Sequence, residues 1–228
     1  MWSQIANFMQ KHAYNPSHLL GKLQQKPKII KTPKILYINR AVRTDRRQFM
    51  ERQLKQLGLQ FERIDAPTPE KPNGFFNRSM RGSYLSHLEL IERIAREMRE
   101  YIIMEDDALI KSLHQMVIGI SRIQQEEWAC LYFYGAPDLR RIYGITDVHA
   151  YLVNPIWAAK IAGALREKYD AVASLPSSPH KDTSTCVDMV IAHNLQYWIP
   201  FWGMNACVIQ DRGKFGSDTG WMIGRKEL

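Results

Sequence analysis

Apolar residues along the chain recur at two spacings, and each spacing predicts one kind of element. Short apolar runs bounded by polar or turn residues predict strands. Such runs lie in KILYIN (34–39), LQFERIDA (59–66), YIIM (101–104) and WACLYFYG (128–135), and YWIPFWGMNACVIQ (197–210) predicts two more short strands. These segments supply the strands of the expected sheet.

Between the strands, apolar residues three or four positions apart predict helices. Met50, Leu54 and Leu57 form one such stripe, and Gly58 is suited to end that helix. Ser83 is the expected cap of the second helix. The expected buried faces of the second and third helices are Leu88, Ile91, Ala95 and Met98, then Leu113, Met116, Val117, Ile120 and Ile123.

Two more helices are expected in the second half of the chain. Asn154 and Pro155 begin one, with Asn as the cap and Pro in the first turn. Residues 186–195 (CVDMVIAHNL) predict a shorter one, which follows the polar segment 174–185, a candidate mobile lid.

Strand, helix and strand follow one another over residues 34–66, which is typical of a βαβ unit with two parallel strands. We therefore expect one α/β domain over residues 32–228, with a mostly parallel sheet flanked by helices. Residues 1–31 are expected to form a helical appendage, because their apolar positions fall at helical spacing. These positions are Trp2, Ile5, Phe8 and Met9.

The segment YIIMEDDALI (101–110) places three consecutive carboxylates directly after a strand that is expected to be buried. Like charges repel and are costly to bury, so such a cluster calls for a cation or for solvent. Ligands of open α/β sheets bind at the carboxyl ends of the strands. Glu105 and Asp107 would share one face of an extended chain, which suits Mg²⁺ or Mn²⁺, whereas Asp106 would point elsewhere. A solvated acidic turn is the alternative.

Composition is ordinary for a globular protein of 228 residues, with 45% hydrophobic and 24% charged residues, and the net charge is +8. A basic balance suits an anionic partner such as a nucleotide phosphate, nucleic acid or an anionic membrane surface, although it also suits a merely solvated surface. Three scattered cysteines without CxxC spacing argue against a disulfide framework and against a cysteine zinc site. Because the first residues lack the pattern of a secretory signal, we expect a cytoplasmic protein that could lie at the inner face of the membrane.

Three blocks in fixed order resemble glycosyltransferase family 25, which holds lipooligosaccharide and collagen-type galactosyltransferases. They are ILYINRAVRTDRRQFMERQLKQLGLQFERIDA (35–66), GSYLSHLELIERI (82–94) and YIIMEDDALI (101–110). Weaker similarity continues in GITDVHAYLVNP (144–155), CVDMVIAH (186–193) and QDRGKFGSD (210–218). The resemblance implies a GT-A-like fold, a Rossmann-type nucleotide half followed by an acceptor half, and a nucleotide-sugar donor, commonly UDP-galactose.

The resemblance also implies roles for residues at the ends of these blocks. Glu105 and Asp107 would hold Mn²⁺ or Mg²⁺, and the other expected donor-binding residues are Asn39, Arg40, Arg46, Arg47, Ser86, His87 and Asp106. An Asn amide can read a uracil base, and an arginine near a helix start can bind diphosphate. His149 and Tyr151 are candidates for the sugar site.

Inverting sugar transfer needs one carboxylate that accepts the proton of the attacking hydroxyl. Asp188 is the candidate, because its apolar neighbours can raise its pKa, and Asp218 is the fallback. Trp198, Phe201 and Trp202 are candidates for stacking on acceptor sugars, with core packing as the alternative.

These observations predict a metal-dependent inverting glycosyltransferase that moves a hexose, in the first instance galactose from UDP-galactose, onto a hydroxyl of a glycan or glycolipid such as lipooligosaccharide. A protein or modified nucleic acid as acceptor stays open. A basic nucleic-acid-binding module without catalysis and a phosphotransferase also stay open, although the sequence GxxxxGK[ST] of P-loop kinases is absent from the chain.

Overall fold

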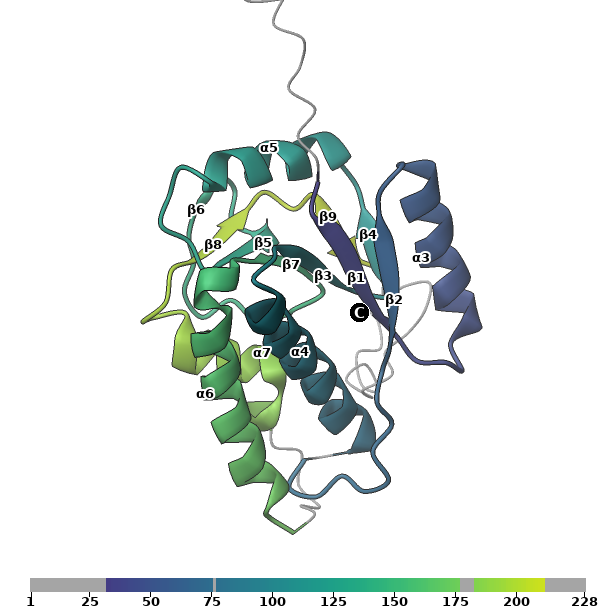
Figure 1. The fold of residues 1–228 in the computed structure, drawn as a ribbon, viewed down its shortest axis with the longest axis vertical. Helices are drawn as coiled ribbons and strands as arrows, with labels where there is room; N and C mark the ends of the chain where they lie inside the picture. The colour runs from purple at the N-terminus through teal and green to yellow at the C-terminus, as the bar shows by residue number, and fades with distance from the viewer. Residues whose placement is uncertain (1–31, 76, 177–182, 212–228) are drawn as a thin grey trace, which may run out of the picture. The chain divides into compact units, whose positions relative to one another are not determined.

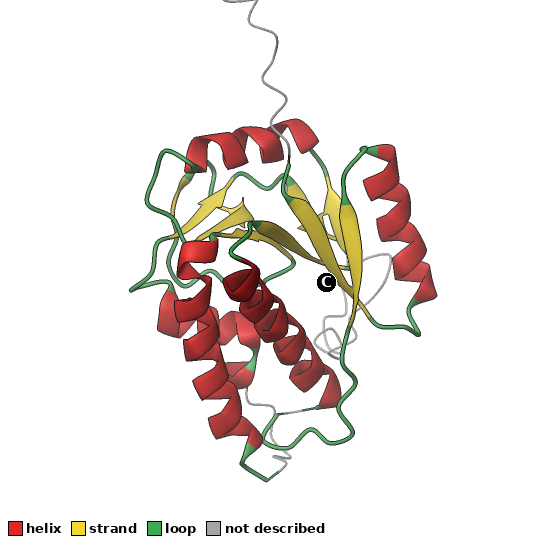
Figure 2. Ribbon diagram, viewed as in Figure 1, coloured by secondary structure: helices red, strands yellow, loops and turns green. Residues whose placement is uncertain are grey.

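The computed structural model describes residues 32–75, 77–176 and 183–211, which Figures 1 and 2 show as ribbons. The first half contains β1 (Lys34–Asn39), α3 (Thr44–Gln56), β2 (Phe61–Asp65), α4 (Arg78–Glu97), β3 (Tyr101–Glu105), β4 (Ala108–Ile110) and α5 (Leu113–Ile123). The second half contains β5 (Cys130–Gly135), β6 (Arg140–Arg141), β7 (Ala150–Val153), α6 (Pro155–Ala173), η1 (Thr183–Thr185), α7 (Val187–Val190), the π-helical turn η2 (Ile191–Leu195), β8 (Phe201–Met204) and β9 (Val208–Gln210).

A seven-stranded sheet with the order β2-β1-β3-β7-β5-β8-β6 forms the centre of the fold. β2, β1, β3, β5 and β8 run in one direction, and β7 and β6 run in the opposite one. The predicted α/β class with a mostly parallel sheet is therefore confirmed. β4 and β9 pair with each other in a separate two-stranded sheet.

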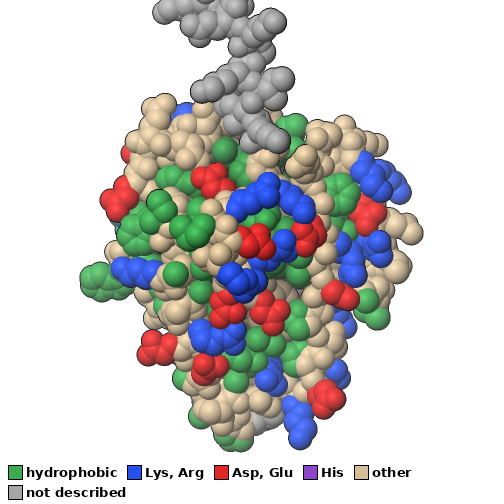
Figure 3. All heavy atoms as spheres, in the orientation of Figure 1, with side chains coloured by type: hydrophobic (Ala, Val, Ile, Leu, Met, Phe, Trp, Pro, Cys, Tyr) green, Lys and Arg blue, Asp and Glu red, His purple; other side chains and the backbone are tan. Residues whose placement is uncertain are grey.

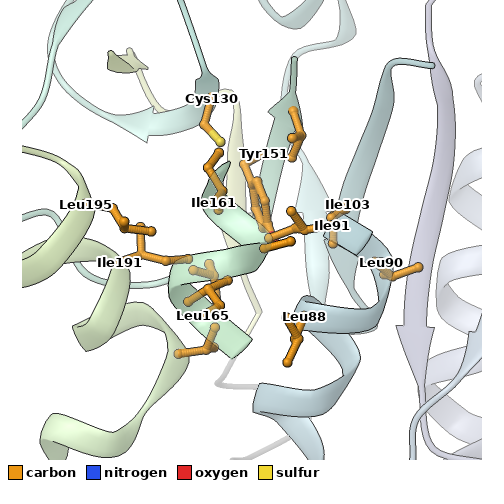
Figure 4. Packing of buried hydrophobic residues seen from close by; sticks show 14 of the residues in the cluster. Leu88, Leu90, Ile91, Ile103, Cys130, Tyr151, Ile161, Leu165, Ile191 and Leu195 are labelled. Carbon is orange, nitrogen blue, oxygen red and sulfur yellow. The ribbon is translucent and has the colours of Figure 1, made fainter. Parts of the chain in front are cut away.

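Helices cover both faces of the sheet, because successive strand residues point to opposite faces. From β1, Ile35 and Tyr37 face α3 and α5, whereas Leu36 and Ile38 face α4 and α6. Tyr151 of β7 packs on the latter side, where Figure 4 shows it between side chains of α4, α6 and η2. The two hydrophobic clusters bury most residues of the central strands β1, β3, β7, β5 and β8.

The helix ends follow the expected capping chemistry, with one correction. Gly58 has a φ of 65° after α3, and the Asn154 side chain accepts a hydrogen bond from the amide of Ile156, as predicted. The second helix does not begin near Ser83. Asn77 caps it by accepting from the amide of Met80 at 2.8 Å, so the helix gains a turn and a half that reaches the site. At its other end Met98 is 62% exposed rather than buried, because the helix ends there in a left-handed residue with a φ of 49°.

The predicted appendage (1–31), the centre of the candidate lid (177–182), and the C-terminal segment with Asp218 (212–228) lie outside the described residues. Among the residues that are described, no helix combines the length and apolarity needed to cross a membrane.

Candidate active site

A cavity of about 590 Å³ lies where β1, β2 and β3 end, and the N-terminal half of α4 closes one side of it. The segment before β7 and the start of α7 close the other side. Nearly all of the predicted site residues line this cavity, namely Asn39, Arg40, Arg46, Ser86, His87, Glu105, Asp106, Asp107 and Asp188. Its volume is in the range of small-molecule sites, which run from roughly 300 to 1,000 Å³.

Glu105 is the last residue of β3, and Asp106 and Asp107 form the tight turn between β3 and β4. The side chains of Glu105 and Asp107 nevertheless converge. Nε2 of Gln210 donates to Glu105 Oε2 at 3.1 Å and to Asp107 Oδ2 at 3.2 Å. The predicted pairing of Glu105 with Asp107 therefore appears in the structure, although a turn produces it and not strand alternation.

Asp106 points away from that pair and is held inside the protein. Its Oδ2 accepts from Asn39 Nδ2 at 2.7 Å, and its Oδ1 accepts from Arg46 Nη1 at 2.8 Å. The same Arg46 nitrogen lies 3.3 Å from Asp107 Oδ2. One buried guanidinium thus partly neutralises two neighbouring carboxylates, which explains how the fold tolerates three consecutive carboxylates at the end of β3.

The electrostatics of the turn separate its two converging carboxylates. Burial, and then the charge of Glu105, raise the pKa of Asp107 to about 7. Burial would also raise the pKa of Glu105, but the hydrogen bond from His87 and nearby positive charges hold that pKa below its ordinary value. Glu105 is therefore the more firmly ionised member of the pair.

His87 is fully buried and links the sheet to Glu105. Its Nε2 lies 3.5 Å from Glu105 Oε1, and its Nδ1 lies 2.9 Å from the hydroxyl of Tyr151. Because Nε2 faces a carboxylate, we place the proton there, so that Nδ1 accepts from the Tyr151 hydroxyl. Tyr151 and His87 therefore orient Glu105. The neighbouring Ser86 donates its hydroxyl to the carbonyl of Gly82 at 2.8 Å, within its own helix.

Asp188 lies at the opposite wall of the cavity, at the start of α7. Burial raises its pKa, as the sequence predicts for a general base, although amide hydrogen bonds from Asp147 and Met189 act against the rise. The amide of Asp147 lies 3.4 Å from Asp188 Oδ2. Asp147 itself has a φ of 77°, a conformation that is costly for most L-residues and tolerated best by Asn and Asp.

Other predicted residues take different places. Arg47 does not line the cavity, and it forms an ion pair with Glu51 on the surface of α3 at 2.8 Å. Both amide hydrogens of Asn39 are donated inside the protein, to Asp106 and to the carbonyl of Arg43. The contacts of these two residues with a donor therefore stay predictions, which this arrangement does not favour.

The aromatic candidates divide into buried and exposed residues. His149 stacks on Tyr134 with ring centroids 4.1 Å apart, and neither His149 nor Tyr151 lines the cavity. Phe201 is buried, and Trp202 donates its indole N–H to the carbonyl of Glu127, so core packing accounts for both. Trp198 is 80% exposed and stays available to a ligand.

Gln210 and Asp147 belong to the site but were not singled out from the sequence, although each lies in a segment with weaker similarity to the family (210–218 and 144–155). Gln210 comes from β9, a short strand far from the acidic turn in the chain, and reaches Glu105 through the pairing of β9 with β4. Asp147 stands in an irregular segment, where an Asp before a strand is typical of any turn. Arg78, which also lines the cavity, precedes the expected start of its helix.

The residues of the turn fit a divalent cation. Asp107 Oδ1 is buried without a hydrogen-bond partner among the described residues, and two carboxylates meet at the single amide nitrogen of Gln210. A hard cation binds such oxygens and leaves its remaining positions to water and to substrate phosphates. The described residues contain no group of three or more His, Cys, Asp or Glu arranged for a metal. Any cation here would therefore have few protein ligands.

Comparison with known protein families agrees with the chemistry of this cavity. Residues 32–137, which contain β1 through β5 and the acidic turn, match the model of glycosyltransferase family 25, described as an LPS biosynthesis protein. The resemblance drawn from the sequence is thereby confirmed, and glycosyltransferase is the class of enzyme that the match supports. No curated protein matches the chain.

Solved structures with a related arrangement are distant in sequence. One is a glycosyltransferase involved in the glycosylation of the major capsid of PBCV-1, with 11% identity over 75% of this chain and 81% of that one, and a TM-score of 0.44. Another is A197 from STIV, with 7% identity over 77% and 83% of the two chains and a TM-score of 0.34. Scores of this size have no bearing on function.

Proposed function

We propose that this protein is an inverting glycosyltransferase that takes a hexose from a nucleotide sugar, with UDP-galactose as the first candidate donor. One observation carries the proposal: a single cavity has two converging carboxylates on one wall and a third carboxylate of raised pKa, Asp188, on the other. Glu105 and Asp107 are suited to bind a cation together with the diphosphate of the donor, and Asp188 is suited to act as the general base.

Three arginines lie on the donor side: Arg46 holds the acidic residues in place, and Arg40 and Arg78 line the cavity. Arg46 is occupied by Asp106 and Asp107, so its role is to hold the acidic turn. Arg40, which follows β1, and Arg78, in the first turn of α4, line the cavity and can donate paired N–H groups to diphosphate oxygens. When bound at Glu105 and Asp107, Mn²⁺ or Mg²⁺ would supply positive charge to the leaving nucleoside diphosphate.

Asp188 would accept the proton of the acceptor hydroxyl as that oxygen attacks the anomeric carbon. A carboxylate with a raised pKa is a stronger base, and burial supplies this rise. The amide of Asp147 orients Asp188 Oδ2. Because the leaving group is a stabilised diphosphate, the reaction needs no separate general acid.

The acceptor belongs to the same proposal. A glycan or glycolipid hydroxyl is the candidate, supported by the description of the matched family as LPS biosynthesis proteins. The net charge of +8 does not by itself favour nucleic acid, since acidic and basic side chains intermingle on the face shown in Figure 3. A cytoplasmic location, with or without contact with an anionic membrane surface, stays a prediction.

Binding and turnover of nucleotide sugars test the proposal. Isothermal titration with UDP-galactose, UDP-glucose and UDP-N-acetylglucosamine, each with Mn²⁺, is expected to show saturable binding of at least one donor. Asp107→Asn is expected to remove the dependence of this binding on Mn²⁺. Asp188→Asn should bind the donor normally and lose transfer. Absence of binding by all nucleotide sugars would refute the donor assignment, and transfer by Asp188→Asn would refute the base.

A further inference from the structure

The segment that enters β7 contacts both walls of the cavity. Residues 147–149 lie directly before β7, which runs between β3 and β5 in the sheet (Figure 1). At one end of this segment, the amide of Asp147 lies 3.4 Å from Asp188 Oδ2. At the other end, the carbonyl of His149 accepts from the amide of Glu105 at 2.9 Å. We call residues 147–149 the bridge segment, because they join the candidate base to the acidic wall.

Asp147 holds an uncommon backbone conformation at the start of the bridge segment. Its φ of 77° lies in the left-handed region. That region costs a non-glycine residue about 1–3 kcal/mol and persists only where the surroundings enforce it. Here both peptide groups of Asp147 are held, since its N–H faces Asp188 and its carbonyl accepts from the hydroxyl of Tyr134. The strained turn is therefore fixed from both sides.

Tyr134 is the residue that holds the bridge segment against the sheet. It lies in β5 and is buried. In the register of β5 with β7, Tyr132 lies opposite Tyr151, so the same register continued by two residues places Tyr134 opposite His149. The rings of Tyr134 and His149 stack with centroids 4.1 Å apart at an angle of 19°. One side chain thus contacts His149 through its ring and Asp147 through its hydroxyl.

The other end of the bridge segment is tied to the acidic wall by side-chain as well as backbone contacts. His149 Nε2 lies 3.5 Å from the carbonyl of Val208 in β9, the strand that supplies Gln210. Gln210 in turn donates to Glu105 Oε2 at 3.1 Å. A shift of the bridge segment would therefore change the position of Asp188 relative to the acidic wall.

We propose that Tyr134 is a positioning residue for sugar transfer: its hydroxyl holds the strained turn at Asp147, and the bridge segment thereby sets Asp188 in the place from which it can accept the proton of the acceptor. This rests on the proposed function. Tyr134 is not among the described residues that line the cavity, so it acts through Asp147 and not by contact with a substrate. A misplacement of about 1 Å can cost about a hundredfold in rate, so a small shift of the bridge segment is enough to impair transfer.

Tyr134→Phe tests the proposal, because it removes the hydroxyl and keeps the ring that stacks on His149. Nucleoside diphosphate release, from the UDP-sugar that wild type binds and with a pool of bacterial core oligosaccharides, measures kcat, and isothermal titration measures donor affinity. We expect kcat to fall by at least about tenfold with donor affinity unchanged. Tyr84→Phe is the matched control, since Tyr84 is fully buried and its hydroxyl donates to the carbonyl of Leu165 at 2.8 Å, outside the described wall of the cavity. It should keep the kcat of wild type.

A second substitution separates positioning from a general loosening of the fold. Glycine adopts a φ of 77° without strain, so Asp147→Gly removes the need for a hydroxyl that holds the turn. Adding Tyr134→Phe to Asp147→Gly should therefore lower kcat by about twofold or less. The same loss as in the wild-type background would overturn the inference, because the hydroxyl would then act in some way other than by holding the turn.

Amide hydrogen exchange gives a readout that needs no activity. The amide of Asp147 should be protected in wild type, and Tyr134→Phe should speed its exchange by at least about tenfold, whereas Tyr84→Phe should not. Unchanged exchange at Asp147, or faster exchange with unchanged kcat, would overturn the inference even if the donor binds normally. Faster exchange in a protein that binds no nucleotide sugar would refute the proposed function, and with it the role of Tyr134 in transfer.

Discussion

The buried guanidinium of Arg46 offers a sharp test of how the acidic turn is held. Arg46→Met keeps most of the aliphatic volume but removes the guanidinium that donates to Asp106 Oδ1 at 2.8 Å and forms an ion pair with Asp107 Oδ2 at 3.3 Å. All three side chains are almost completely buried. Removing one partner of a buried ion pair leaves an uncompensated charge and costs about 3–5 kcal/mol of unfolding free energy.

Arg47→Met is the matched control, one residue along the same helix. Its side chain is 51% exposed and pairs with Glu51 at the surface, where such pairs contribute about 0–1 kcal/mol. Urea unfolding of wild type and both variants at pH 7, in the absence of divalent cations, measures the difference. If Arg46→Met loses no more stability than Arg47→Met, the buried cluster does not hold the turn as described.

The pH dependence of the stability lost in Arg46→Met gives a second test. Burial raises the pKa of Asp106 and of Asp107, and in both residues the charge of Arg46 opposes that rise. Without Arg46 both folded-state pKa values should lie higher still. When a carboxyl group has a raised pKa in the folded state, the unfolding free energy of the protein falls as pH rises through that pKa. The difference in unfolding free energy between wild type and Arg46→Met should therefore increase from pH 4 to pH 8. A difference that stays constant over this range would contradict the electrostatic explanation.

Three further predictions concern backbone and surface features that support the site. Asp147→Gly should be as stable as wild type in thermal unfolding, because glycine adopts a φ of 77° without strain. Asp147→Ala should lose about 1 kcal/mol or more of unfolding free energy, because alanine is strained at this φ. Gly82→Ala should destabilise the protein by about 1–3 kcal/mol in urea unfolding, because the added Cβ would lie 2.5 Å from the carbonyl oxygen of Pro67. The control Gly163→Ala, whose added Cβ meets nothing within 4 Å, should be neutral or stabilising by up to about 1 kcal/mol. Hydrogen bonds from Arg93 and Lys34 lower the pKa of Glu62 to about 2. The ionised Glu62 should therefore add about 1 kcal/mol to the unfolding free energy, after allowing for its partial exposure, above pH 4.5, and this contribution should be lost as pH falls toward 2. Glu62→Gln should remove this pH dependence.

The strands of the first half and most of the cavity follow from the sequence because their signals are local. Apolar runs mark β1, β2, β3 and β5, and polar residues directly after β1 and β3 mark the edge of the sheet where a ligand binds. The sequence predictions include no strand at β7, whose four residues, Ala150–Val153, lie directly before the expected helix cap Asn154. Its reversed direction follows from pairing with β3 and β5, which no local pattern encodes.

Within the site, the sequence predicts which residues gather but not which of them face the ligand. Arg46 and Arg47 are equivalent by spacing, yet the helix turns one toward Asp106 and the other toward solvent. Gln210 reaches the acidic turn only because β9 pairs with β4, a contact between distant parts of the chain. Long-range pairing of this kind decides the details that local patterns cannot reach.

The central claim is that one cavity binds a nucleotide sugar on its acidic wall and activates a hydroxyl on the wall of Asp188. Release of nucleoside diphosphate from UDP-galactose with Mn²⁺, in the presence of a pool of bacterial core oligosaccharides, tests it most directly. We predict acceptor-dependent release by wild type, and a loss of at least about a hundredfold in Asp188→Asn, within the range of general-base catalysis, with donor affinity unchanged. Equal release by both proteins, or loss of donor affinity in Asp188→Asn, would contradict the account.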